Sequence, residues 1–307
     1  MLKPRALEPG ARIAVVSPAS SAKGERIERG VAALRARGYE VALGEHAEGR
    51  WPQYLSGTAE DRLEDLHAAF ADPEIDAIIC SRGGYGSNYL LEGLDLELIR
   101  ENPKPFFGYS DLTTVQTWLL DAVDLVAFHG PMAAADFSRE DGIEDSSFDA
   151  AVSGGTVAVG EREGLRILKP GRVRGTVYGG CLSILTASLG TRFEPQMEGR
   201  LLFLEDLAAK PYQVDRMLRQ LILAGKLDGV PGIVFGEMLE CVSPGTDSKM
   251  LEAVILRVLD WFDGPIAIGL RSGHVSRSNV TLPLGIEAEL NLEEEPVLEY
   301  LEPAVQV

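Results

Sequence analysis

Short apolar runs alternate with helical stripes along the first half of the chain. Ile13–Val16, Ile75–Cys80 and Pro105–Gly108 predict strands, and Tyr39–Leu43 and Leu125–Phe128 can form two more. Between these runs, apolar residues recur every three or four positions and predict helices: Ile27, Val31 and Leu34; Leu63, Leu66 and Phe70; Leu112, Val115, Leu119 and Leu120. This alternation predicts a parallel sheet with helices on both faces.

A second pattern begins near residue 167. Leu201–Leu204, Ile233–Phe235 and Ile266–Ile268 predict strands. Two helical stripes accompany them: Val214, Met217, Leu218 and Leu221; Leu251, Val254, Ile255, Val258 and Phe262. The segment between the two patterns is acidic, contains Ser and Gly and has weak periodicity, which predicts a surface linker. We therefore expect an N-terminal α/β domain over residues 1–140, a linker over 141–166 and a second domain over 167–307.

The charge balance argues against some classes of partner. The 307 residues include 29 basic and 47 acidic side chains, for a net charge of −18. This field repels nucleic acids and anionic membranes, so we expect neither as a partner. Three distant cysteines, Cys80, Cys181 and Cys241, indicate neither a disulfide framework nor a zinc site. We expect no metal and no cofactor. Without a secretory or membrane-spanning run in the sequence, a cytoplasmic location is expected.

Ser110, in "PFFGYSDLTT", occupies a predicted strand-to-helix turn. Such a turn can expose a hydroxyl above a sheet, beside the free N–H groups of the next helix. Ser and Asp are also good helix caps, and this stretch alone favours the cap. The glycine-rich "SRGGYGSN" follows another strand, and in open α/β sheets sites gather at such strand ends.

That glycine-rich stretch matches neither the Walker pattern nor G-x-G-x-x-G, so the support for a nucleotide site is weak. Its glycines can bring backbone N–H groups close to an oxyanion, or can simply form a tight turn.

A serine nucleophile needs a base, and the chain has four histidines: His46, His67, His129 and His274. The first two lie in polar or surface settings. His129 ends a strand, whereas His274 follows Gly273 in a flexible loop, so composition favours His274 over His129. An orienting carboxylate is also required. Glu205 and Asp206 follow a buried strand, but the residues alone do not choose between them or exclude an ordinary loop acid.

Several stretches together resemble one family. "SRGGYGSNYLL", "FFGYSDLTT", "FHGPM", "LLFLEDLAAKPYQVDRML" and "GHVSRSNVTLPLG" are similar to motifs of the LD-carboxypeptidase family, which also contains the microcin C7 immunity-type peptidases. The resemblance covers nearly the whole chain in the right order, from "IAVVSPAS" to "TLPLG".

The resemblance implies a catalytic set. The nucleophile of the family falls on Ser110, its glutamate on Glu205 and its histidine on His274. The oxyanion hole falls on backbone N–H groups of Asp111 and of the Gly83–Gly84 turn, with Gly84 preferred. One position departs from the family pattern, because Cys181 stands in "YGGCL" where the family often has Asn.

The resemblance also implies the architecture. It predicts an N-terminal parallel-sheet domain of flavodoxin-like, amidotransferase-like type, a C-terminal β-rich α/β domain, a site between them and a homodimer. The implied reaction is release of the terminal D-alanine from a murein tetrapeptide, across an L,D-bond, during cytoplasmic recycling of cell-wall peptides.

Two other functions stay open. A microcin-immunity-type peptidase would cleave an amide joining an acidic amino acid to a nucleotide, and a non-catalytic protein would only bind a small molecule. For a peptide substrate, we expect contacts from Gly83 and Tyr109, and from Arg82 and Arg271, whose guanidinium groups suit carboxylates. Structural salt bridges explain the two arginines equally well.

Overall fold

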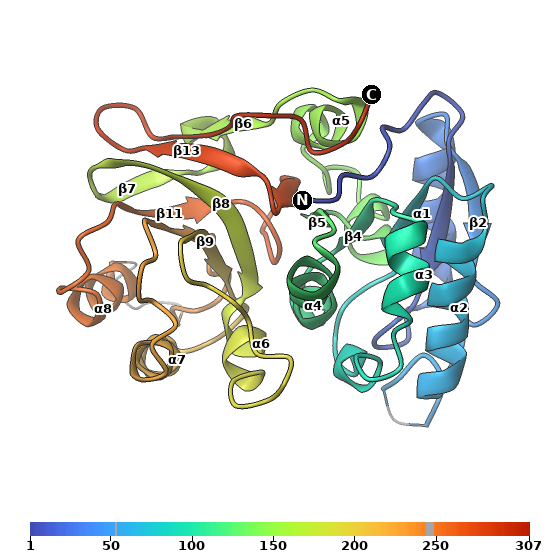
Figure 1. Cartoon of the computed structure of the whole chain (residues 1–307), viewed down its shortest axis with the longest axis horizontal. Helices are drawn as coiled ribbons and strands as arrows, with labels where there is room; N and C mark the ends of the chain where they lie inside the picture. The colour runs from blue at the N-terminus through green and yellow to red at the C-terminus, as the bar shows by residue number, and fades with distance from the viewer. Residues whose placement is uncertain (53, 244–248) are drawn as a thin grey trace.

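The computed structural model describes residues 1–52, 54–243 and 249–307, and places two sheets side by side (Figure 1). Within these residues, the first sheet has six strands in the order β12-β5-β4-β3-β1-β2. The strands are β1 (Arg12–Val16), β2 (Glu40–Leu43), β3 (Ala77–Cys80), β4 (Phe106–Gly108), β5 (Ala127–His129) and β12 (Leu282–Leu284). All neighbours are parallel except β12 and β5. The flavodoxin-like order 2-1-3-4-5 is therefore confirmed.

Helices cover both faces of the first sheet, as its strand pattern predicts. Ile13 and Val15 of β1 pack with Leu34 of α1, whereas Ala14 and Val16 join the core that contains Leu66. The helices are α1 (Gly24–Ala36), α2 (Ala59–Ala71), α3 (Leu96–Glu101) and α4 (Thr113–Val123), with short turns η1 (Ser87–Tyr89), η2 (Ser110–Leu112) and η3 (Ala133–Phe137). Because β1 is buried on both faces, its sequence is a continuous apolar run.

The second sheet belongs to the C-terminal half and has eight strands among the described residues, in the order β6-β14-β13-β8-β9-β10-β11-β7. Its strands are β6 (Ala158–Gly160), β7 (Arg166–Lys169), β8 (Arg172–Cys181), β9 (Arg200–Glu205), β10 (Ile233–Gly236), β11 (Ile266–Leu270), β13 (Glu287–Asn291) and β14 (Val297–Tyr300). Helices α6 (Leu182–Ala187), α7 (Pro211–Leu223) and α8 (Met250–Val258) accompany it. Phe262, predicted on the last helix, lies beyond its end.

The segment 141–166 is not the surface linker that its composition predicts. It forms α5 (Asp145–Ser153), β6 and the turn η4 (Glu161–Glu163). Phe148 of α5 is fully buried and its ring lies 5.5 Å from that of Phe107 on the first sheet. The few apolar residues of this acidic stretch are thus spaced to bury one helical face, while β6 pairs with β14 of the second sheet.

One strand of the C-terminal half returns to the first sheet. β12 pairs antiparallel with β5, with Leu282 opposite His129. All three residues of β12 are buried, and its central Pro283 fits the edge strand of a sheet. The boundary expected at residue 167 therefore does not separate the two sheets, because Leu282–Leu284 extends the N-terminal one.

The two halves meet along α4, which packs against β8 and α6 (Figure 1). A methyl group at Gly180, near the end of β8, would lie 2.7 Å from Thr113 Oγ1, at the start of α4. The glycine lets the two backbones approach closely. This contact brings the ends of β4 and β9 to one boundary.

Candidate active site

Ser110 lies in a strained turn between β4 and α4. Its φ of +65° places a non-glycine residue in the left-handed region, which is energetically costly. No side chain caps η2 or α4, and the Asp111 carboxylate instead accepts the Ser87 N–H at 2.7 Å. The turn therefore does not use Ser110 as a helix cap. A strained strand-to-helix turn is a geometry that exposes a nucleophilic hydroxyl.

Ser110 and His274 line one pocket of about 440 Å³, which we call the serine pocket. Gly83 and Gly84, from the loop after β3, line the same pocket. A methyl group at Gly83 would lie 2.7 Å from Ser110 Cβ, so a glycine is needed for this close approach. The pocket thus joins a serine of the N-terminal half to a histidine of the C-terminal half.

His274 is held by a buried carboxylate. Its ring Nδ1 lies 2.8 Å from Glu205 Oε2, and its backbone N–H donates to the same oxygen at 3.1 Å. A carboxylate accepts only, so Nδ1 carries the proton and Nε2 is left as the basic nitrogen. The Glu205 side chain is 1% exposed and that of His274 16% exposed. The pair is therefore oriented and largely shielded from water.

The pKa values of the two groups shift in opposite directions. Burial lowers the pKa of His274, but the charge and hydrogen bond of Glu205 outweigh it, so the pKa lies above its usual 6.5. Burial raises the pKa of Glu205, yet the neighbouring His274 charge and hydrogen bond leave it below its usual value. The arrangement stabilises an imidazolium beside a carboxylate, which is what a base needs after accepting a proton.

Neighbouring candidates have other partners. Asp206 accepts the Ser183 N–H at 2.8 Å, at the start of α6. His129 is fully buried, its Nδ1 lies 2.9 Å from Ser272 Oγ, and burial lowers its pKa to about 4. His129 does not line the serine pocket among the described residues. Geometry therefore pairs His274 with Glu205 rather than Asp206, and it places His274 rather than His129 in the pocket with Ser110.

Two backbone N–H groups near Ser110 have no acceptor among the described residues, those of Gly84 and Asp111. Gly84 has a φ of +118°, and a methyl group there would lie 2.4 Å from the Ser20 hydroxyl. The Ser20 hydroxyl accepts a hydrogen bond from the Tyr85 N–H at 3.1 Å, not from the Gly84 N–H. The positions that the family resemblance assigns to an oxyanion hole can thus donate to a ligand oxygen.

Tyr109 and Arg82 line the serine pocket, but Arg271 does not. The Tyr109 ring packs edge-on against the His274 ring at 5.2 Å, and Arg82 Nε donates to the Gly83 carbonyl at 3.2 Å. Arg271 lines a different pocket, where it donates to the Arg162 carbonyl at 2.6 Å. Its backbone N–H donates to the Glu163 carbonyl at 2.9 Å, which ties the residue to the turn that contains Arg162.

Sequence reasoning missed two basic residues of the serine pocket. Lys23 and Arg26, at the start of α1, line it together with Arg82. Both side chains are exposed and form no ion pair within the described residues. They follow β1, and ligands in such sheets bind beyond the carboxyl ends of the strands, so that rule would have pointed to them.

Cys181, the departure from the family pattern, is buried next to the pair. It lies opposite Glu205 in the β8–β9 register, and its N–H donates to Thr113 Oγ1 at 3.0 Å. Burial raises the pKa of its thiol well above the usual value. Cys181 is therefore a neutral group at this position.

Residues 1–52, 54–243 and 249–307 contain no group of His, Cys, Asp or Glu placed to hold a metal ion. None of the helices in these segments has the length and apolarity to span a bilayer.

Comparisons with known proteins identify a family. Residues 13–130 match the LD-carboxypeptidase N-terminal domain, and residues 174–290 match the LD-carboxypeptidase C-terminal domain. A probable murein peptide carboxypeptidase of Bacillus subtilis is 36% identical over 95% of this chain and 92% of its own length.

Solved structures are also similar. A muramoyltetrapeptide carboxypeptidase from Oxalobacter formigenes is 29% identical, with a TM-score of 0.83 over 94% of this chain and 98% of its own. The microcin C7 self-immunity protein MccF, in complex with aspartyl sulfamoyl adenosine, is 26% identical, with a TM-score of 0.91 over 100% of both chains. From these matches over nearly its whole length, the chain belongs to the LD-carboxypeptidase family and is a peptidase.

Proposed function

We propose that the protein is a serine carboxypeptidase that releases the terminal D-alanine of murein tetrapeptides. The observation that carries this proposal is that Ser110 shares one pocket with His274, whose ring is held by Glu205. The names of the relatives supply the substrate class, because two of them are murein or muramoyltetrapeptide carboxypeptidases.

In the proposed mechanism, Ser110 Oγ attacks the carbonyl of the scissile bond while His274 Nε2 accepts the hydroxyl proton. The Gly84 and Asp111 N–H groups stabilise the developing oxyanion, and Glu205 stabilises the imidazolium. His274 then returns the proton to the leaving amine of D-alanine. Water, activated by the same imidazole, hydrolyses the acyl-enzyme and restores Ser110.

The charge of the serine pocket supports recognition of a chain terminus. Lys23, Arg26 and Arg82 line it, and none of its described lining residues is acidic. In a chain with a net charge of −18, this local excess of positive charge suits the free carboxylate of the leaving residue. A cytoplasmic recycling role and a homodimeric state are part of the same proposal.

Mass spectrometry of three substrates tests the proposal. The purified protein is incubated with the tetrapeptide L-Ala-γ-D-Glu-diaminopimelate-D-Ala, with its epimer ending in L-alanine, and with aspartyl sulfamoyl adenosine, at equal concentrations. We expect D-alanine and a tripeptide from the first substrate only, since the wrong stereocentre displaces the carbonyl from Ser110. Cleavage of the adenosine conjugate alone would replace this function with an immunity-type one, and binding without cleavage would indicate a non-catalytic protein.

A further inference from the structure

A second pocket, of about 570 Å³, adjoins the serine pocket and has no part in the proposed chemistry. We call it the tyrosine pocket. Two turns separate the pockets: Gly84 and Ser110 line the serine pocket, and the residues that follow them, Tyr85 and Asp111, line the tyrosine pocket. If the cations of the serine pocket hold the substrate's terminal carboxylate, the rest of the peptide must extend away from them, and these turns lead to the tyrosine pocket.

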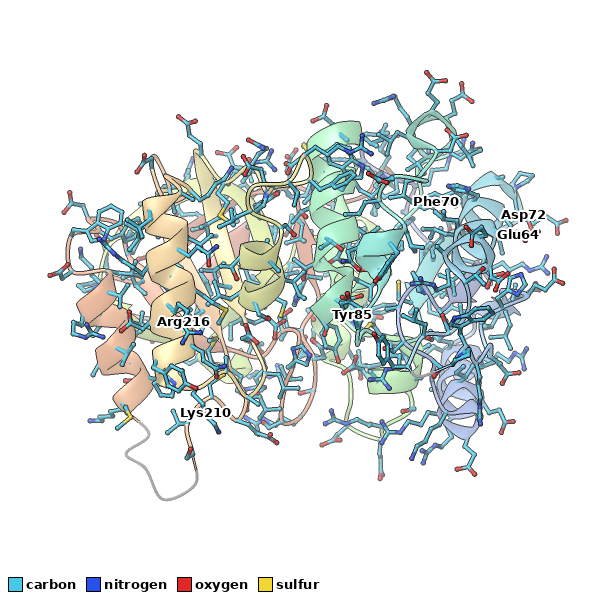
Figure 2. All side chains as sticks on the ribbon, turned by 90° about the horizontal axis from the view of Figure 1, so that it is seen from below. Glu64, Phe70, Asp72, Tyr85, Lys210 and Arg216 are labelled. Atoms are coloured by element: carbon cyan, nitrogen blue, oxygen red, sulfur yellow. The ribbon has the colours of Figure 1, made fainter. Side chains whose placement is uncertain are left out.

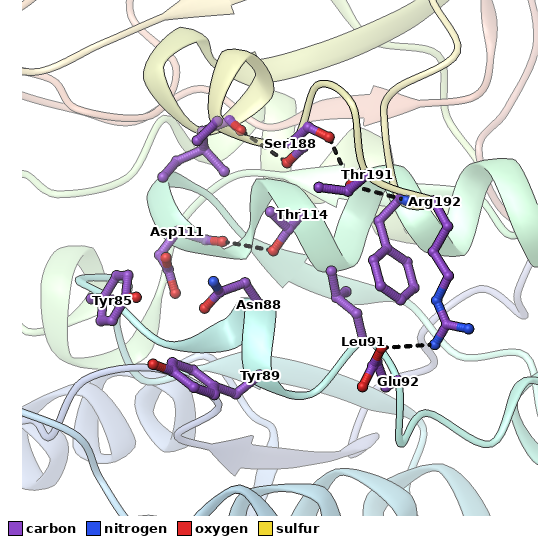
Figure 3. Close-up of a pocket in the computed structure, with 13 residues that line it drawn as sticks. Tyr85, Asn88, Tyr89, Leu91, Glu92, Asp111, Thr114, Ser188, Thr191 and Arg192 are labelled. Carbon is purple, nitrogen blue, oxygen red and sulfur yellow. Dashed lines mark hydrogen bonds and ion pairs between the residues drawn. The ribbon is translucent and has the colours of Figure 1, made fainter.

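The tyrosine pocket lies between the halves of the chain (Figure 3). Figure 2 labels one of its lining residues, Tyr85. Tyr85 and Tyr89, 42% and 58% exposed, form one wall, with ring centroids 6.2 Å apart. Ile184, Ala187 and Phe193 come from the opposite half. Exposed aromatic rings that face apolar side chains are typical of a binding surface.

A charge pair lies at the far end of this pocket. The Arg192 guanidinium is 3.2 Å from Glu92 Oε1, and their side chains are 65% and 76% exposed (Figure 3). An ion pair this exposed adds little stability and opens at little cost. Arg192 also lies 4.8 Å over the Phe193 ring, which holds the guanidinium in place. This end of the pocket therefore presents one positive and one negative group, Arg192 and Glu92, both exposed to a ligand.

The distance from Ser110 decides which part of a substrate reaches this pair. Phe193 packs against Trp118 at 4.9 Å, and Trp118 lies seven residues beyond Asp111, roughly 10 Å along the helix. The side chain of the substrate residue next to the scissile bond is shorter than this distance of roughly 10 Å. Two further peptide residues, at about 3.5 Å each or more, cover the gap.

We propose that the tyrosine pocket binds the amino-terminal part of the substrate, with its free α-ammonium on Glu92 and the α-carboxylate of its γ-linked D-glutamate on Arg192. The inference rests on the proposed function and adds a specificity to it. A peptide that still carries an acyl group on its amino terminus lacks the ammonium, and an isoglutamine peptide lacks the carboxylate. Each therefore loses one of the two contacts.

The test measures kcat/KM for D-alanine release from three peptides: the free tetrapeptide, its N-acetyl form and its isoglutamine form. Glu92→Gln is expected to lower kcat/KM about three- to tenfold on the free peptide and to leave the N-acetyl peptide unchanged. Arg192→Met is expected to do the same on the free peptide and to leave the isoglutamine peptide unchanged. Arg257→Met, which removes an exposed pair with Asp215 between α7 and α8, is the matched control and should change none.

The outcomes separate the two proposals. Equal losses on all three peptides, or no loss on any, overturn the inference and leave the proposed function standing. Absence of D-alanine release by the wild-type protein from every peptide overturns the proposed function and this inference with it.

Discussion

At the scale of single residues, Ser110 and Gly83 show how backbone conformation positions a side chain. A φ of +65° at a serine is retained only where the surrounding structure imposes it. Here β4 enters the turn from a buried sheet and α4 leaves it, while Gly83 approaches to contact distance. The strain thus accompanies a hydroxyl that is placed toward a pocket rather than into a helix cap.

The His274–Glu205 pair makes a prediction about pH. A base must be neutral, so kcat/KM should fall as pH drops through the raised His274 pKa, above 6.5. Glu205→Gln removes the charge that raises this pKa, so the acid limb should move to lower pH and the plateau should fall about 10²–10⁴-fold. Rates of D-alanine release from about pH 5 to 9 measure both.

His67→Gln is the control for that profile. His67 lies on α2, outside the serine pocket, and its ring accepts a hydrogen bond from the Asp95 N–H. Its acid limb should coincide with that of the wild type. An acid limb for Glu205→Gln at the same pH or higher would contradict the assignment of Glu205.

Single residues were partly predictable from the sequence. Ser110, Glu205 and His274 rested on the family motifs, since the residues alone left the helix cap, Asp206 and His129 open. Arg271 was expected near the substrate because of its place before His274. Its guanidinium is bound to the Arg162 carbonyl, a contact between residues 109 positions apart that no local pattern reveals.

At the scale of elements, the loop after β11 depends on one glycine. Gly273 has a φ of +92°, and a methyl group there would lie 2.7 Å from Glu205 Cδ and 2.8 Å from His129 Cε1. Gly273→Ala should therefore lower the free energy of unfolding by about 1–3 kcal/mol through backbone strain. Overlap of the methyl group with Glu205 and His129 should add to this loss. The same overlap should displace Glu205 and lower the catalytic rate.

Gly10→Ala is the matched control for this prediction. Gly10 has a φ of +86°, and nothing lies within 4 Å of the added methyl group. Gly10→Ala should therefore lower the free energy of unfolding only through backbone strain, by about 1 kcal/mol. Denaturant unfolding and D-alanine release measure the two effects. Equal stability and activity for the two variants would show that crowding at Gly273 is unimportant.

The inner strands β1 and β3 of the first sheet were predictable because both of their faces are buried and their sequences are largely apolar. Short elements were not. Leu282–Leu284 has three residues and a proline, so its pairing with β5 follows from the tertiary fold rather than from a pattern. Likewise α5 buries Phe148 through an otherwise polar sequence, and the acidic composition concealed it.

At the scale of the whole molecule, the candidate site exists only because two halves of the chain meet. Ser110 comes from the first half, and Glu205 and His274 come from the second. The sequence indicated strand ends as the place for a site. Arg82 was expected near a substrate, whereas its neighbours Lys23 and Arg26 were not, because the net charge of −18 conceals a local positive region. Partner surfaces follow local charge rather than the sum.

The central claim is that Ser110 attacks the L,D-bond before D-alanine. Its most direct test is the rate of D-alanine release from the L,D-tetrapeptide by Ser110→Ala, beside the wild type, with thermal unfolding of both as a control for folding. The account predicts loss of at least about 10³-fold in kcat at an undiminished unfolding temperature, because the serine acts together with His274 and Glu205. A folded Ser110→Ala protein that retains activity within a few-fold of the wild type would contradict it.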